Sequence, residues 1–199
     1  MIPASPKESL SEEELDFCLM NRIAQGDMGA MEELIERHQK RVLGTVIKML
    51  GNDAEAEDIA QQVFLRVWNS ADTYTASAKF TTWLFKITRN LVFNEVRRRN
   101  RHPALALEQE MEEHHFQAEE SRIARPDDSL LEAELQQAIQ EAIESLPEIQ
   151  RMAIVLRRYE ELSYEEIAEI LDLSLPAVKS TLFRARQELR AKLAKYLEP

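Results

Sequence analysis

Glycine, cysteine and alternating β-branched residues are scarce in this chain, and each scarcity excludes a class of structure. The 199 residues contain only four glycines, and neither Asn-Gly nor Asp-Gly, the usual dipeptides of tight hairpin turns, occurs. Long stretches rich in Glu, Ala, Leu, Gln and Arg instead repeat their apolar positions at the helical period. The sequence therefore predicts an all-α protein.

The single cysteine, Cys18, excludes an internal disulfide framework and suits a reducing compartment. No apolar run approaches the length of a membrane span. The opening residues, MIPASPKESLSEEEL, have neither a basic start nor an apolar centre, so a signal peptide is not expected. We expect a cytoplasmic protein that does not insert into a membrane.

The formal net charge of −11 is unevenly distributed along the chain. Residues 79–101 hold seven bases and one acid, and residues 179–195 hold six bases and one acid. Residues 102–128, in contrast, hold eight acids and two bases. Two local basic patches in an acidic chain are the electrostatic pattern that binding to nucleic acid requires.

Helical periodicity and breaks in composition divide the chain into two small helical domains joined by a flexible acidic linker. Ser11 and Glu14 have the spacing of a capping box at the start of the first helix. The linker has proline near each end, high charge and weak periodicity. The expected divisions are a disordered tail (1–10), a first domain (11–101), the linker (102–128) and a second domain (129–199).

The second domain ends in a pattern typical of a helix-turn-helix. Ser163 and Glu166 form a second capping box, Asp172 stands at the turn where glycine is usual, and Ser174 can cap the next helix. That next helix should turn five side chains away from its apolar face: Lys179, Ser180, Phe183, Arg184 and Gln187. Helical hairpins that bind no DNA share this plan, so the pattern alone leaves both readings open.

Three segments, taken in order, resemble the extracytoplasmic-function (ECF) class of bacterial sigma factors. They are AEDIAQQVFLRVW (Ala56–Trp68), FTTWLFKITRN (Phe80–Asn90) and the stretch from Leu146 to Arg186. The resemblance implies a transcription initiation factor without cofactor or catalytic site. Its first domain would bind the clamp of core RNA polymerase and open the minus-10 DNA. Its second would read the minus-35 element and touch the polymerase flap. An anti-sigma factor is a further implied partner.

The resemblance implies a polymerase-binding face on the helix that contains Ala56–Trp68. Its positions share one side of that helix because they lie three, four and seven residues apart. The alternative is an ordinary solvated face, with Ile59, Val63, Phe64 and Trp68 as core. The implied residues are Asp58, Gln61, Gln62 and Leu65.

The resemblance also implies a minus-10 surface on the loop 72–79 and the helix that follows it. Tyr74 could stack on a flipped base, although packing on its own domain is an equal alternative, and Trp83 is expected to be structural. Asparagines could bond to adenine, and the cations would contact phosphates. The implied residues are Tyr74, Thr75, Ser77, Lys79, Lys86, Asn90, Asn94, Arg97 and Arg98.

The resemblance implies that the recognition helix and the helices before it contact the minus-35 element. Thr181 stands where relatives often have a basic residue, so we expect one charge fewer at this surface. Arg186 and Arg190 are expected to serve solubility at least as readily as DNA binding. The implied residues are Arg157, Tyr164, Lys179, Ser180, Phe183 and Arg184.

Three other kinds of protein compete with this interpretation. An enzyme would need a nucleophile with a base, a phosphate loop or a metal cluster, and only His114-His115 beside linker acids suggests a metal. An ordinary repressor would bind free duplex DNA, usually as a dimer. A pure interaction module would bind polymerase or an inhibitor but not DNA.

The acidic segments and the resemblance together suggest a closed resting form. In that form the two domains would pack together, or against an anti-sigma protein, and would bury their DNA-reading faces. Core polymerase would then separate them.

Overall fold

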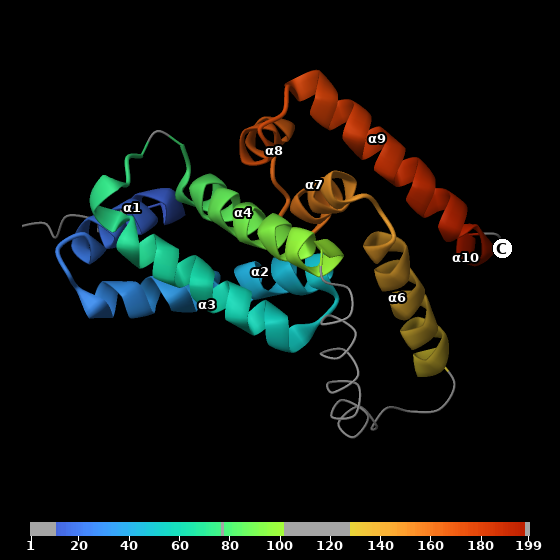
Figure 1. The fold of residues 1–199 in the computed structure, drawn as a ribbon, viewed down its shortest axis with the longest axis horizontal. Coiled ribbons are helices and arrows are strands. Elements are labelled where there is room, and N and C mark those ends of the chain that lie inside the picture. Colours follow the sequence, from blue (N-terminus) through green and yellow to red (C-terminus); the bar gives the residue numbers. More distant parts are fainter. Residues whose placement is uncertain (1–10, 77, 102–127, 198–199) are drawn as a thin grey trace, which may run out of the picture.

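Helices make up nearly all of the described chain and fall into two groups (Figure 1). The computed structural model describes residues 11–76, 78–101 and 128–197. The first group comprises α1 (Glu12–Ile23), α2 (Met28–Leu50), α3 (Asp53–Asn69), the short 3-10 helix η1 (Ala71–Thr73) and α4 (Phe80–Arg101). The second comprises α6 (Asp128–Glu144), α7 (Glu148–Arg158), α8 (Tyr164–Leu171), α9 (Leu175–Lys192) and α10 (Ala194–Leu197).

Within the described residues the predicted all-α class is confirmed. The tail 1–10 and nearly all of the linker predicted at 102–128 lie outside those residues. No helix among the described residues is both long enough and apolar enough to span a bilayer.

Local side-chain chemistry sets the helix ends. Ser11 with Glu14, and Ser163 with Glu166, form the two predicted capping boxes, in which the serine oxygen and the glutamate carboxylate satisfy backbone amides reciprocally. The predicted cap at Ser174 is also present, because its hydroxyl accepts from the amide of Ala177. These sequence predictions are confirmed.

A buried polar contact joins α1 to α2. Asp16 on α1 is 3% exposed, and its Oδ1 accepts from Arg37 Nε and His38 Nε2, each at 3.0 Å. The His38 ring lies 5.1 Å from the Phe80 ring at the start of α4. One carboxylate therefore ties α1 to α2, and His38 extends the contact to the end of the 72–79 loop.

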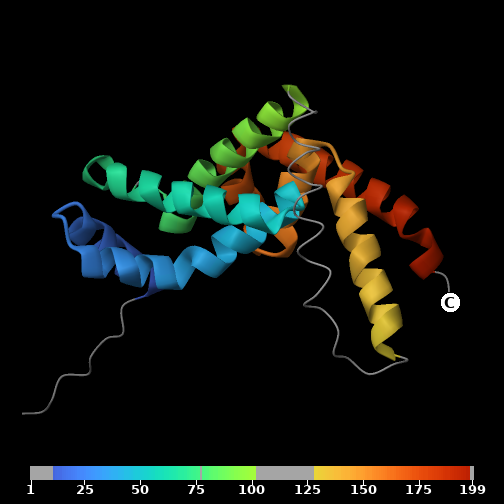
Figure 2. The same ribbon diagram turned by 60° about the horizontal axis from the view of Figure 1, so that its bottom comes forward.

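The two helix groups pack directly on each other. Helix α8 lies against α4, and α7 and α6 lie against α2, as the two views of Figures 1 and 2 show. The buried apolar side chains form one connected cluster that runs from the first group into the second. The structure is thus a closed arrangement of the two groups.

The Asp16 contact predicts a specific loss of stability. Asp16→Asn removes the charge that Arg37 and His38 face, and should lower the free energy of unfolding by about 1–3 kcal/mol. Trp68 and Trp83 are the chain's two tryptophans and both lie in the first group, so their fluorescence during urea unfolding measures this loss.

Glu12→Gln is the control for that measurement, since Glu12 is an exposed carboxylate on the same helix. Equal unfolding midpoints for the two variants would contradict a stabilising role for Asp16.

Candidate polymerase and nucleic-acid interfaces

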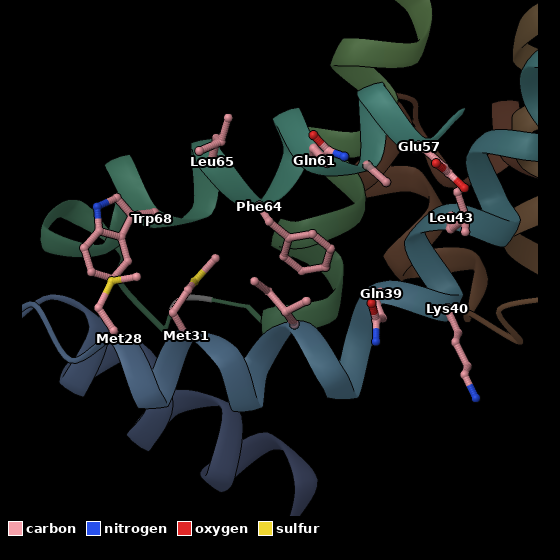
Figure 3. A pocket seen from close by; sticks show the side chains of 12 residues that line it. Met28, Met31, Gln39, Lys40, Leu43, Glu57, Gln61, Phe64, Leu65 and Trp68 are labelled. Carbon is pink, nitrogen blue, oxygen red and sulfur yellow. The ribbon is translucent and has the colours of Figure 1, made fainter. Parts of the chain in front are cut away.

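An apolar groove of about 890 Å³ runs between α2 and α3. Figure 3 shows Met28 and Met31 rising from α2 toward Trp68 and Phe64 of α3. Polar side chains border the groove, among them Gln39, Lys40, Glu57 and Gln61. An apolar floor with a polar rim has the composition of a protein-docking site.

Two of the four predicted polymerase-binding residues, Gln61 and Leu65, line this groove. Leu65 is 61% exposed, which is unusual for a large apolar side chain that serves only the core. Asp58 and Gln62 are exposed on the same helix outside the lining.

Sequence reasoning missed the contribution of α2 to this groove, and it named Phe64 and Trp68 only as core residues of the alternative, solvated-face interpretation. Phe64 is buried and Trp68 half-buried, and both also form the groove wall. The methionines of α2, three residues apart, give a weak signal, but nothing in the sequence shows that they face α3.

The loop before α4 is anchored by an aromatic cluster. Tyr74 is half-buried, with its ring 5.0 Å from Trp83 and 6.1 Å from Phe80. Burial is the main cause that raises the pKa of the Tyr74 hydroxyl, and the charge of Asp16 raises it further. Tyr74 therefore packs on its own helix group in this arrangement. Thr75 is exposed, and Ser77 lies outside the described residues.

A small pocket of about 260 Å³ lies beside this cluster. Trp83 forms part of its wall, so this residue is both a packing element and a lining residue, and Asn90 is at its edge. The remaining lining residues are Arg66, Ser70, Thr73 and Ile87. The aromatic wall and the amide side chain together could receive a planar, hydrogen-bonding group.

Farther along α4 the predicted DNA-contacting residues are exposed but differ in their partners. Asn94 Oδ1 accepts from Arg97 Nη2 at 2.8 Å. Arg98 forms ion pairs with Glu95 at 2.8 Å and Glu55 at 3.6 Å. The hydrogen bond that Arg98 donates to the Glu95 carboxylate raises the pKa of the Arg98 guanidinium.

Glu13 of α1 and acids of the second helix group meet the cations Lys79 and Lys86 at the start of α4. Lys79 Nζ lies 2.9 Å from a carboxylate oxygen of Glu13 and 3.4 Å from one of Glu166 on α8. Lys86 Nζ lies 3.4 Å from Asp172, which also pairs with Arg89. Part of the predicted minus-10 surface therefore faces α8 in this arrangement.

A helix-turn-helix is formed by α8 and α9. Asp172 ends α8 with φ 54°, in the left-handed conformation expected at a turn that lacks glycine. Four predicted side chains are exposed along α9: Lys179, Ser180, Phe183 and Arg184. Phe183 is 62% exposed, and Arg184 Nη2 donates to the Ser180 hydroxyl at 3.1 Å. No described residue of the first group covers this face, in contrast to the predicted burial of both DNA-reading faces.

Thr181 differs from its expected role. It is only 6% exposed, so it belongs to the packed side of α9 and its lack of charge leaves the outer face unchanged. The sequence interpretation of Thr181 as a lost surface charge was therefore wrong.

A cluster of cations surrounds Tyr164 at the start of α8. Arg186 Nη2 donates to the Tyr164 hydroxyl at 3.4 Å, and the Arg157 guanidinium carbon lies 5.2 Å from the centre of the Tyr164 ring. Arg186, which the sequence assigned as readily to solubility, thus joins two predicted minus-35 residues. Two guanidinium groups beside the N-terminus of α8 suit an anionic backbone.

No group of three or more potential metal ligands occurs among the described residues, and His114-His115 lies outside them.

A helix-turn-helix with an exposed recognition face, carried beside a second helical group with its own basic helix, defines a class of DNA-binding transcription proteins. Residues 34–102 match the family described as "Sigma-70 region 2", and residues 136–189 match "Sigma-70, region 4".

The ECF RNA polymerase sigma-E factor of Escherichia coli K12 is 33% identical over 186 residues, which cover 92% of this chain and 97% of that protein. The RNA polymerase sigma-H factor of Pseudomonas aeruginosa is 30% identical over 179 residues, covering 89% and 93%.

Two solved structures share the fold. CnrH, in complex with the cytosolic domain of CnrY, has a TM-score of 0.66 at 24% identity, covering 92% of this chain and 99% of that chain. The sigma factor RpoE from Bartonella quintana, in complex with the anti-sigma factor NepR, has a TM-score of 0.61 at 24% identity, covering 82% and 96%.

The chain belongs to the sigma-70 family of RNA polymerase sigma factors, in its ECF class. It is therefore a promoter-directing transcription initiation factor and not an enzyme.

The cation cluster at Tyr164 predicts an altered titration. The hydrogen bond and the charge of Arg186 lower the pKa of the Tyr164 hydroxyl, since both favour the phenolate. Arg186→Gln removes this charge and should return that pKa toward its usual range. Alkaline absorbance titration of the variant and of Tyr164→Phe would measure the change. Identical curves for the wild type and Arg186→Gln would contradict the contact.

Proposed function

We propose that core RNA polymerase docks on the groove between α2 and α3, with Leu65 as the apolar anchor and Gln61 at its edge. The observation that supports this most strongly is the 61% exposure of Leu65 above an apolar floor. Asp58 and Gln62 flank the groove with polar groups. A buried apolar centre within a polar rim is the usual anatomy of a stable interface.

The proposed minus-10 surface is α4 and the loop before it. Asn90 and the pocket beside Trp83 would receive a base, and Asn94 would contact the opened strand. Tyr74 would stack on the strand after leaving or extending its aromatic cluster, and the remaining residues would contact polar or phosphate groups. These are Thr75, Ser77, Lys79, Lys86, Arg97 and Arg98.

The proposed minus-35 surface is the outer face of α9, with phosphate contacts at the start of α8. Lys179, Ser180, Phe183 and Arg184 would enter the major groove, and their exposure supports this role. Arg157 and Tyr164 would fix the protein on the DNA backbone, and Arg186 joins them because it donates to Tyr164.

The proposal assigns residues 11–101 to polymerase binding and minus-10 DNA, and residues 129–199 to minus-35 DNA. It places the protein in the bacterial cytoplasm, where RNA polymerase works. An anti-sigma factor is a proposed partner because CnrH and the Bartonella RpoE, which share the fold, were solved in complex with CnrY and the anti-sigma factor NepR.

Titration of labelled protein against core RNA polymerase, and separately against duplex DNA, tests this function. We expect tight binding to core and weak, salt-sensitive binding to free DNA. Leu65→Asp should weaken core binding at least about tenfold, because it places a charge in the apolar centre of the interface.

Asn21→Asp adds the same charge on α1, which contributes no residue to the groove, and serves as the control. Equal affinities of both variants for core would remove the groove from the interface, and tight specific binding of the wild type to free duplex would favour a repressor.

A substitution at Arg184 tests whether recognition of the upstream element is separate from polymerase binding. Arg184→Ala should weaken recognition of the upstream element by about 1–3 kcal/mol while core binding stays unchanged, because its side chain lies on the exposed face of α9. Promoter-binding assays with reconstituted holoenzyme would measure the loss. Arg190→Ala, at an exposed position farther along the same helix, is the control, and a loss of core binding in Arg184→Ala would refute the division of roles.

A further inference from the structure

Two non-glycine residues adopt positive φ among the described residues, and each stands at or next to a contact between the two helix groups. They are Asp172, with φ 54°, and Glu161, with φ 56°. Aspartate tolerates this conformation, whereas it is disfavoured for glutamate, so the surrounding structure must hold Glu161 in it. Glu160, which precedes Glu161, supplies the acid at one contact. Asp172 itself supplies the acid at the other.

The first contact centres on Asp172 at the turn of the helix-turn-helix. Its carboxylate pairs with Arg89 and lies 3.4 Å from Lys86 Nζ. The Arg89 Nε also donates to the carbonyl of Ile170 at 2.9 Å, so one guanidinium binds both the turn and the end of α8. The hydrogen bond that Arg89 donates lowers the pKa of the Asp172 carboxyl below its usual range.

The second contact centres on Glu160, in the connection between α7 and α8. Its carboxylate accepts from Arg41 Nε at 2.8 Å and from the Thr45 hydroxyl at 3.0 Å, both on α2. The Glu160 side chain is only 6% exposed, so water does not replace these partners in the closed arrangement. Glu160 therefore fixes the connection on α2 while Asp172 reaches α4.

The two proposed DNA-reading surfaces differ in whether their cations are paired with acids of the other helix group. Lys86 of the proposed minus-10 surface and its neighbour Arg89 are engaged by Asp172, whereas Lys179 and Arg184 on α9 remain exposed. A carboxylate held between a lysine and an arginine matches the charge and the acceptor geometry of a backbone phosphate. The closed arrangement thus occupies a phosphate-binding pair on one surface only.

We propose that Asp172 acts as an internal substitute for a promoter phosphate: in the free protein it occupies Lys86 and Arg89, and the minus-10 strand must displace it. The proposal rests on the proposed minus-10 role of α4. Asp172 is 60% exposed and Lys86 40% exposed, so solvent screens the pair and exchange for a phosphate is feasible.

The test measures binding of a short fluorescein-labelled oligothymidylate to the free, full-length protein at low salt. Asp172→Asn keeps a side chain that tolerates the left-handed conformation and removes only the charge. We expect it to tighten binding about three- to tenfold, the range of a modest ion pair. Glu169→Gln is the control, because it changes the net charge by the same amount on the helix that Asp172 ends. Glu169 is exposed and forms no ion pair with any described residue, so its substitution should change binding less than twofold.

Lys86→Ala completes the design as a double-mutant cycle. If Asp172 competes for Lys86, most of the gain from Asp172→Asn disappears in the Lys86→Ala background. A full gain in that background, or equal effects of Asp172→Asn and Glu169→Gln, would overturn the proposal. Circular dichroism would check the fold of each variant, and Asp172→Gly repeats the test with the residue that favours positive φ.

The design separates two failures. If Lys86→Ala alone leaves oligothymidylate binding unchanged, the proposed minus-10 role of this face fails. If Lys86→Ala weakens binding but Asp172→Asn has no effect beyond that of the control, the role of the face stands and only the competition by Asp172 is refuted.

Discussion

The C-terminal end of α2 is the point on which the arrangement of both helix groups depends. Gly51 ends the helix with φ 72°, and the last carbonyls then need partners from elsewhere in the chain. Arg99 of α4 donates to the Leu50 carbonyl at 2.9 Å, and Arg151 of α7 donates to the Met49 carbonyl at 2.7 Å. One arginine from each group therefore completes the same helix end.

Arg151 extends this junction to α6. It donates to the Leu146 carbonyl at 3.3 Å and also contacts the Glu144 carbonyl, and its burial lowers the pKa of the guanidinium. A Cβ atom at Gly51 would lie 2.9 Å from a carboxylate oxygen at the flexible end of the Glu144 side chain, so the φ of 72°, rather than this approach, favours glycine there. Helix α2 also carries residues of the apolar groove and Arg41, which binds Glu160 in the connection before α8. The position of α2 at this junction therefore affects where α8 meets α4.

Local chemistry explains what the sequence could predict. Capping boxes depend on residues three apart, so Ser163 with Glu166 predicted the start of α8, and the turn at Asp172 followed from its tolerance of positive φ. The all-α class and the order of helices followed from periodicity in the same way. Contacts between distant segments were beyond this reasoning, since no spacing shows that Asp172 faces Lys86 or that Met28 faces Trp68. Thr181 failed for a related reason, because neighbouring helices decided its burial.

The net charge of −11 gains a structural meaning from these long-range contacts. Acids of the second group, Glu160, Glu166 and Asp172, pair with cations of the first, so part of the acidic excess is used within the molecule. Apolar contact fixes the closed arrangement, while exposed ion pairs decide how readily α4 is released. If the proposed minus-35 face is free and the proposed minus-10 face is engaged, upstream DNA can bind α9 before Asp172 leaves α4. Promoter opening would then follow, rather than precede, recognition of the upstream element.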